Sequence, residues 1–384
     1  MREKNRNTVV VAKWVLMFFV LGLIIGPAAV RAASSEGQRL LQQLVEAARK
    51  EGQLDLMVTS AQGEKGTKEL TDAFKQRFGL NIRVNADISG QESQQFNKAA
   101  IEVKGNIPPT HDLMQGGDEN VLSLKEAGGA DAIENWEALL AVIAPESYKV
   151  KDKISPFSLA GYGFLWSTRT VVLLFNPKLI SEKELPKTWK EMGNAKYAGA
   201  FSLPPWTSVA LMGLLKYDKD EWLDTVRSWG RNKKQILAYT AGTQRMLLGD
   251  IKFLFGNTDD YAREKARDPN APIGLTFFED FTQIRWVQYV VRKGAKNPNA
   301  AKLFALWATS AEANRIFEKN GFLENVVLGS GPVTTQFLKT IKERNIRPVN
   351  WFDSPKNLEK FRWLSTDEGK AYSKAIATAQ RDGK

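Results

Sequence analysis

The stretch SPFSLAGYGFLWSTRTVVLLFNPKLI at residues 155–180 decides how the chain divides. It is rich in β-branched and aromatic residues, lacks helical periodicity, and ends in the turn signal Asn176-Pro177. A second stretch of similar texture, IGLTFFEDFTQIRWVQYVV, occupies residues 273–291. We expect the first stretch to cross, as two extended strands, into a second lobe, and the other stretch to return. The sequence therefore predicts two lobes joined by two crossing segments.

The residues before the first crossing alternate between short apolar runs and amphipathic segments. Alternation of this kind is typical of an open, mainly parallel α/β sheet flanked by helices. The predicted strands are residues 54–61, 81–89 and 111–117, and the predicted helices are residues 36–50, 66–79, 93–105 and 121–129. Ligands of such sheets bind beyond the carboxyl ends of the strands.

The segment between the crossings repeats the alternation and forms a second α/β unit. Its predicted strands are residues 200–203 and 251–257, and its predicted helices are residues 206–217, 218–234, 241–250 and 258–268, the last capped by Thr258. The helical remainder of the chain is expected to pack on the first lobe. We therefore assign residues 33–155 and 282–384 to lobe 1 and residues 156–281 to lobe 2.

The N-terminus has the layout of a secretory signal peptide. Basic residues precede an apolar stretch from Trp14 to Ile25, and small residues follow. We expect residues 1–32 to be removed by cleavage near Ala32. That segment carries five basic residues and one acidic residue, so its loss lowers the formal charge from +11 to +7. No dense basic run with interleaved aromatics is present, which argues against nucleic acid as a partner.

The 384-residue chain has no cysteine. This excludes thiol nucleophiles, thiolate metal sites and a lipid anchor built on an N-terminal cysteine. We expect a free periplasmic protein that needs no cofactor. The single histidine, His111, begins a strand rather than ending one, so it is poorly placed for catalysis. The prediction is that the protein is not an enzyme.

The order of several passages resembles bacterial extracellular solute-binding proteins of the group that includes ferric-iron binders. The most specific passages are KGAKNPNAAKLFALWATSAEAN at 293–314 and the Gly249-Asp250 pair followed by a strand and an Asn-containing turn. The resemblance covers nearly the whole chain after the signal segment. It implies a two-lobed type II periplasmic-binding fold with the ligand between the lobes. It also implies a hinge in the crossing segments.

The resemblance breaks where ferric binders of this group carry two adjacent tyrosines. This chain has Asp259 and Asp260 there, followed by Tyr261 alone. Carboxylates are also hard oxygen donors, so the two aspartates are candidate ligands should the solute be a metal ion. If the solute is not a metal ion, we expect the protein to bind no metal.

Candidate binding residues follow strands on both sides of the predicted cleft. Trp206, Thr207 and Ser208 open a helix and can hold an anionic group at its N-terminus. For most of the other candidates a turn or an N-cap is the simpler interpretation. Arg169 in the first crossing is a weaker candidate. The candidates are Ser60, Gln62, Gly116, Gly117, Trp206, Thr207, Ser208, Asn257, Asp259, Asp260, Tyr261 and Glu279.

The expected function is the capture of a small charged solute by closure of the two lobes, and its delivery to an inner-membrane permease of an ABC importer. The rival functions are a sensory binding protein that presents its ligand to a membrane receptor, and an enzyme on the same fold. The expected oligomeric state is a monomer. The paired aspartates favour a cation, polyamine or metal, and the +7 charge and the helix start at Trp206 favour an anion, so the solute class stays open.

Overall fold

The computed structural model describes residues 26–88, 92–153, 161–329 and 332–384. The predicted signal segment lies outside these residues up to position 25, and helix α2 (Gly26–Glu51) runs through the predicted cleavage position at Ala32. None of the helices in the described ranges is long and apolar enough to cross a membrane.

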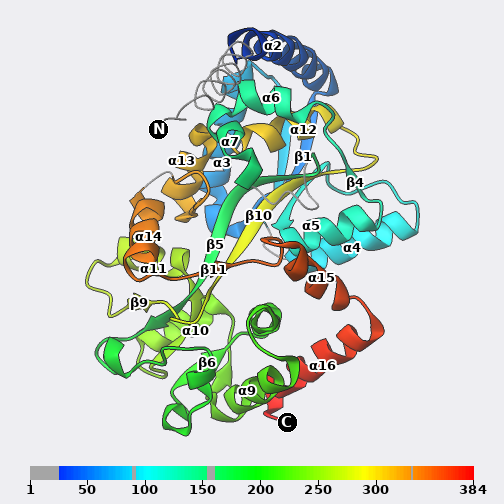
Figure 1. Cartoon of the computed structure of the whole chain (residues 1–384). Helices are drawn as coiled ribbons and strands as arrows, with labels where there is room; N and C mark the ends of the chain where they lie inside the picture. The colour runs from blue at the N-terminus through cyan, green and yellow to red at the C-terminus, as the bar shows by residue number, and fades with distance from the viewer. Residues whose placement is uncertain (1–25, 89–91, 154–160, 330–331) are drawn as a thin grey trace, which may run out of the picture.

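Two α/β halves lie at opposite ends of the molecule, joined by strands that run through its middle (Figure 1). Among the described residues the strands form one continuous sheet in the order β2-β1-β3-β10-β5-β8-β6-β7. The elements of the first half are α2, β1 (Gln53–Met57), η1 (Ser60–Gln62), α3 (Gly63–Phe78), β2 (Arg83–Asp87), α4 (Glu92–Lys104), β3 (Leu113–Gly117), α5 (Asp118–Glu126), β4 (Ala130–Asp131), α6 (Trp136–Ile143), α7 (Pro145–Lys149), η2 (Lys151–Lys153), α12 (Pro298–Trp307) and α13 (Ala311–Gly321).

The first half has the parallel sheet that the sequence predicts. β1 pairs in parallel with β2 and with β3, so the carboxyl ends of the strands meet at one edge. Leu54 and Leu56 of β1 are fully buried, and helices α2 and α12 pack over the sheet. The α/β class and the two-lobed arrangement are therefore confirmed.

Strands β5 (Gly163–Phe175) and β10 (Thr282–Arg292) cross between the halves side by side and antiparallel. Where two crossing strands were predicted in residues 155–180, the described part holds one strand of 13 residues, and residues 154–160 lie outside the description. All residues of β5 except Arg169 are buried, because sheet neighbours flank it and side chains cover both faces. Burial on both faces explains why its sequence is apolar without alternation.

The second half contains the remaining sheet. β8 pairs with β5 and with β6, and the N-terminus of α11 is capped by Asn257 and Asp260 in a capping box, so the prediction that Thr258 caps this helix is wrong. The elements are η3 (Glu182–Glu184), η4 (Lys190–Gly193), η5 (Ala195–Tyr197), β6 (Phe201–Leu203), α8 (Ser208–Leu211), η6 (Met212–Leu215), α9 (Lys219–Asn232), β7 (Gln235–Ile236), α10 (Tyr239–Leu247), β8 (Phe253–Asn257), α11 (Thr258–Arg267) and β9 (Gly274–Thr276).

The C-terminal segment does not return to the first half as predicted. Helix α16 (Asp367–Asp382) packs on α9, where Gly230 lets the backbones approach so closely that an added Cβ would lie 1.9 Å from the Ala379 carbonyl oxygen. Gln380 also donates to the carbonyls of Pro204 and Trp206. The other elements after residue 331 are α14 (Pro332–Glu343), β11 (Pro348–Val349) and α15 (Pro355–Trp363). The assignment of all residues after 282 to lobe 1 is thus wrong for α16.

Candidate functional site

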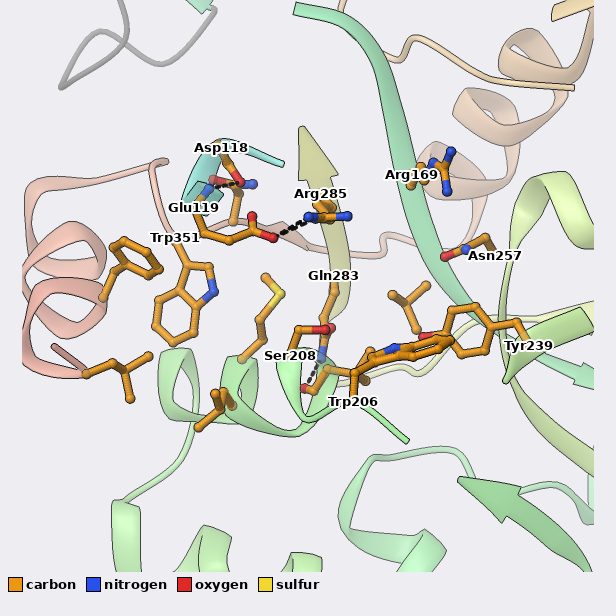
Figure 2. A pocket seen from close by; sticks show the side chains of 17 residues that line it. Asp118, Glu119, Arg169, Trp206, Ser208, Tyr239, Asn257, Gln283, Arg285 and Trp351 are labelled. Atoms are coloured by element: carbon orange, nitrogen blue, oxygen red, sulfur yellow. Dashed lines mark hydrogen bonds and ion pairs between the residues drawn. The ribbon is translucent and has the colours of Figure 1, made fainter. Parts of the chain in front are cut away.

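Two adjoining cavities lie where the halves meet. The first, which we call the apolar chamber, has a volume of about 280 Å³ and is enclosed largely by hydrocarbon and aromatic side chains (Figure 2). Its lining residues are Asp118, Glu119, Arg169, Val171, Trp206, Ser208, Val209, Leu211, Met212, Tyr239, Asn257, Gln283, Arg285, Asn350, Trp351, Phe361 and Leu364.

The second cavity, which we call the polar chamber, has a volume of about 700 Å³. It lies between the turn after β1 in the first half and the start of α11 in the second. Its lining residues are Thr59, Ser60, Ala61, Gln62, Gly63, Arg169, Trp206, Ala238, Tyr239, Thr240, Asn257, Asp259, Asp260, Arg263, Asn320 and Phe322.

Four residues line both chambers and mark the boundary between them: Arg169, Trp206, Tyr239 and Asn257. The rings of Trp206 and Tyr239 meet edge to face with centroids 4.8 Å apart. Arg169 Nη2 donates to Thr59 Oγ1 at 2.9 Å, which ties the crossing strand to the first half. The chambers therefore adjoin each other along these four residues.

The carboxylates of the polar chamber already have partners within the fold. Arg263 donates to Asp259 Oδ2 at 2.8 Å and to Asp260 Oδ1 at 3.2 Å, and the backbone N–H of Asn257 donates to Asp260 Oδ2 at 3.0 Å. Burial and the neighbouring Asp259 carboxylate raise the pKa of Asp260 to about 6. These two aspartates shape the start of α11 and neutralise an arginine.

A third carboxylate, Glu324, lies buried behind the polar chamber. Its backbone bridges to Thr168 of β5, and Thr170 Oγ1 donates to its Oε1 at 2.7 Å. Burial raises its pKa to about 7, and the nearby Asp259 charge adds to this, although hydrogen bonds from Thr170 and Thr258 oppose the shift. This bridge links the crossing strand β5 to the segment that follows α13.

Arg285 of β10 is held by two carboxylates from the first half. Its Nη2 lies 2.5 Å from Glu92 Oε1 and 2.5 Å from Glu119 Oε1, and its Nε donates to Glu119 at 2.8 Å. Gly117 makes room for the guanidinium, since an added Cβ would lie 2.3 Å from Arg285 Nε. The positive charge of Arg285 is therefore balanced before any solute binds.

Two other side chains of the apolar chamber each keep one buried oxygen without a hydrogen-bond partner, and Arg169 Nε at the boundary is also without one. Asp118 and Gln283 are each only 1% exposed, yet Asp118 Oδ2 and Gln283 Oε1 make no hydrogen bond. Burial, and next the Glu119 charge, raise the pKa of Asp118 well above its ordinary value, and Asn350 and Arg285 only partly offset this. Buried polar atoms are normally satisfied, so both oxygens are candidates for contact with a ligand.

Seven of the predicted residues line the two chambers, and five lie elsewhere. The chamber-lining residues are Ser60, Gln62, Trp206, Ser208, Asn257, Asp259 and Asp260. Gly116 and Gly117 lie behind the apolar chamber, where they make space for Phe96 and Arg285.

The remaining three predicted residues lie outside both linings. Thr207 precedes α8, a helix of only four residues, which is too short to supply the dipole that the anion hypothesis requires. Tyr261 packs against the core of the second half. Glu279 is exposed and lies in a separate hollow, 3.6 Å from Lys187.

The described residues contain no group of three or more His, Asp or Glu side chains placed to hold a metal ion. Asp259 and Asp260 fit a metal poorly, because Arg263 occupies oxygens that would face the ion. His111 lies 3.3 Å from Asp87, outside both chambers.

Several residues that line the apolar chamber were not predicted. Asp118 and Glu119 directly follow the predicted Gly116-Gly117 turn, so the same rule about strand ends would have reached them one residue later. Gln283 and Arg285 alternate along a strand that faces the cavity, a spacing visible in the sequence. Trp351 had no such signal, because its position depends on where the C-terminal segment packs.

Comparison with known proteins identifies a family and a fold. Residues 69–342 match the family model described as bacterial extracellular solute-binding protein. No curated protein matches the chain. Iron-bound HitA from Pseudomonas aeruginosa is similar in structure, with a TM-score of 0.62, 18% identity, and coverage of 84% of this chain and 99% of that one.

Two further solved structures are similar at comparable coverage. A periplasmic thiamin binding protein has a TM-score of 0.65 at 10% identity and covers 85% of this chain and 96% of its own. AfuA from Actinobacillus pleuropneumoniae, with fructose-6-phosphate bound, has a TM-score of 0.62 at 17% identity and covers 82% of this chain and 98% of its own. At these identities the likeness establishes the fold.

Proposed function

The chain belongs to the bacterial extracellular solute-binding protein family, and from this we propose that it is the periplasmic binding component of an ABC importer. It captures a small charged solute between its two halves and delivers it to a membrane permease. The observation that supports this most is the position of the chambers. Their walls come from both halves and from the crossing strands β5 and β10.

The proposed mechanism is closure about the crossing strands. Thr59–Gly63 of the first half and Asp259–Arg263 of the second line the same polar chamber. A solute that contacts both walls stabilises the closed form by its differential affinity for that form over the open one. β5 pairs with β10 at its start and with β8 at its end, so it is continuous between the halves. The register of the β5–β10 pair shifts between Val287 and Gln288, and at this irregularity the two strands can bend while staying paired.

The structurally similar proteins bind chemically different solutes, since HitA is iron-bound and AfuA has fructose-6-phosphate bound. The shared architecture therefore carries no fixed solute, and the chemistry of the lining residues decides it. We propose that the polar chamber is the entrance and that the apolar chamber holds the end of the solute that determines specificity. No bond is made or broken in this scheme, and the protein acts as a monomer.

A thermal-shift screen of the purified, ligand-stripped protein tests the proposal. Metals, amines, amino acids, carboxylates, phosphonates and sugars are the solute classes, and a solute that binds the native state raises the melting temperature. We expect a saturable rise with one class, reduced by Trp206→Ala at the chamber boundary. The matched control Glu279→Ala changes an exposed residue outside both linings and should leave the rise intact. No rise with any class would contradict the proposal.

A further inference from the structure

The walls of the apolar chamber suit an uncharged body. Val171 of β5, Met212 of η6 and the rings of Trp206, Trp351 and Phe361 all face it. Covering these walls with aliphatic or aromatic groups removes apolar surface from water, which favours binding. A small ion alone would leave most of this surface unused.

Two of the polar atoms left open in this chamber are acceptors, and a third, Arg169 Nε at the boundary, is a donor. Gln283 Nε2 donates to the Val209 carbonyl at 2.8 Å, which fixes the amide orientation and leaves Oε1 unpartnered. The Glu119 backbone N–H donates to Asp118 Oδ1 at 3.1 Å, while Oδ2 has no partner. Two buried acceptors require a ligand that donates N–H or O–H groups.

The charges around the chamber also lack one cation. Glu92 and Glu119 share Arg285 (Figure 2 shows the pair with Glu119), and Asp118 has no guanidinium or ammonium of its own. Arg169, at the boundary, is turned to the Thr59 hydroxyl on the side of the polar chamber. With Asp118 ionised, three carboxylates face two arginines, and a ligand with one positive charge balances the third.

We propose that the apolar chamber binds an organic cation, namely an aliphatic or aromatic body that carries a protonated amine or an amidinium group. Its N–H groups donate to Asp118 Oδ2 and Gln283 Oε1, and its body packs against the aromatic wall. The inference rests on the proposed function, because it names the class of solute that the binding protein takes. The raised pKa of Asp118 agrees with it, since burial favours the protonated carboxyl and a bound cation favours the carboxylate.

One wall of the chamber comes from residues beyond the family match. Asn350, Trp351, Phe361 and Leu364 all follow residue 342, where that match ends. They are held in place by contacts such as that of Lys360 Nζ with the Leu214 carbonyl at 2.6 Å. The selectivity proposed here therefore depends partly on a segment that the family model does not include.

Calorimetric titration of the purified, ligand-stripped protein with shape-matched ions tests the inference. The probes are benzamidinium and benzoate, phenethylammonium and hydrocinnamate, and cyclohexylammonium and cyclohexanecarboxylate. At least one cation should bind at least tenfold more tightly than its carboxylate partner. Asp118→Asn should weaken that cation tenfold or more, and the matched control Asp72→Asn on helix α3 should not.

A second readout separates direct contact from damage to the fold. Across a series of pH values, binding of the cation should release a proton in the wild type wherever Asp118 is protonated in the free protein, measured in buffers of different ionisation enthalpy, and Asp118→Asn should abolish the release. Equal affinity for cations and carboxylates, or an unchanged affinity in Asp118→Asn, would overturn the inference. If every cation fails while another solute class raises the melting temperature, the inference falls and the binding function stands. If no solute of any class binds, both fall.

Discussion

The polar and apolar chambers share four residues but use their carboxylates in opposite ways. In the polar chamber, Asp259 and Asp260 are satisfied by Arg263 and by the start of α11. In the apolar chamber, Asp118 and Gln283 are buried and keep one oxygen each without a partner. The difference teaches that the presence of acidic residues in a cleft does not identify a site. A buried polar atom that the fold leaves unsatisfied is the better indicator, and the polar chamber has one in Gln62 Oε1.

The comparison yields a general expectation for substitutions. Changes to the polar-chamber carboxylates or their partners should alter the stability of the fold and its dependence on pH. Changes to the unpartnered groups of the apolar chamber should alter affinity for the solute and leave stability nearly unchanged. Changes to the wall formed by residues 350–364, or to the contacts that hold the C-terminal segment in place, should affect both affinity and stability.

The largest loss of stability is expected from Gly230→Ala, which disturbs the packing of the C-terminal helix α16 on α9. An added methyl group would lie 1.9 Å from the Ala379 carbonyl oxygen, so helices α9 and α16 must separate. We expect a loss of about 3 kcal/mol in the free energy of unfolding, measured by urea denaturation. Affinity for the solute should fall as well, because Gln380 of α16 holds the carbonyls of Pro204 and Trp206.

Gly105→Ala is the matched control for that change. Its added methyl group would lie 3.1 Å from the side chain of Ile107, which is exposed and can move, and 3.3 Å from the Ile101 carbonyl oxygen, so the loss should stay below about 1 kcal/mol. Equal losses in the two variants would show that the contact between α9 and α16 is not tight.

A smaller change in the free energy of unfolding is expected from the titration of Glu324, and it depends on pH. Its folded pKa of about 7 lies above its ordinary value, so it stabilises the fold fully below pH 4.5, and this contribution disappears as pH rises through 7. Between pH 5 and 8 the wild type should lose about 2 to 3 kcal/mol through this group. Glu324→Gln keeps the acceptor for Thr170 and should remove that part of the slope. An unchanged slope of unfolding free energy against pH would contradict the assignment.

Arg263→Ala should cost about 2 kcal/mol, because it leaves two buried carboxylates without their cation while the arginine itself is partly exposed. The pKa of Asp260 should rise further above about 6, so the loss grows with pH. Arg267→Ala, one turn along α11, removes a more exposed partner of Glu264 and should cost less than about 1 kcal/mol. The two losses are compared through the urea midpoints of both variants at pH 6 and pH 8. Equal losses in the two variants would contradict the prediction.

Much of the fold could be predicted because its signals are local. The alternation of apolar runs and amphipathic helices identified strands β1, β2, β3 and β8, and the β-branched crossing stretches identified β5 and β10. The position of α16 could not be predicted, since an amphipathic helix can cover any apolar surface. Its docking depends on the fit of Gly230 to the Ala379 backbone, which appears only in three dimensions.

The site could be predicted only in part, for a related reason. The strand-end rule located Ser60, Gln62 and Asn257 at the cleft, because it depends on topology alone. It could not distinguish Asp259, which is neutralised by Arg263, from Asp118, which is not. That distinction depends on partners that are remote in the sequence.

The central claim is that the unpartnered carboxyl of the apolar chamber is reserved for the solute, and the most direct test compares Asp118→Asn with Asp259→Asn. Both variants are titrated with the solute found by screening, and both are unfolded in urea. The account predicts that Asp118→Asn lowers affinity tenfold or more with little change in stability. It predicts that Asp259→Asn lowers stability and changes affinity less than about threefold. The reverse pattern, with affinity lost at Asp259 and retained at Asp118, would contradict it.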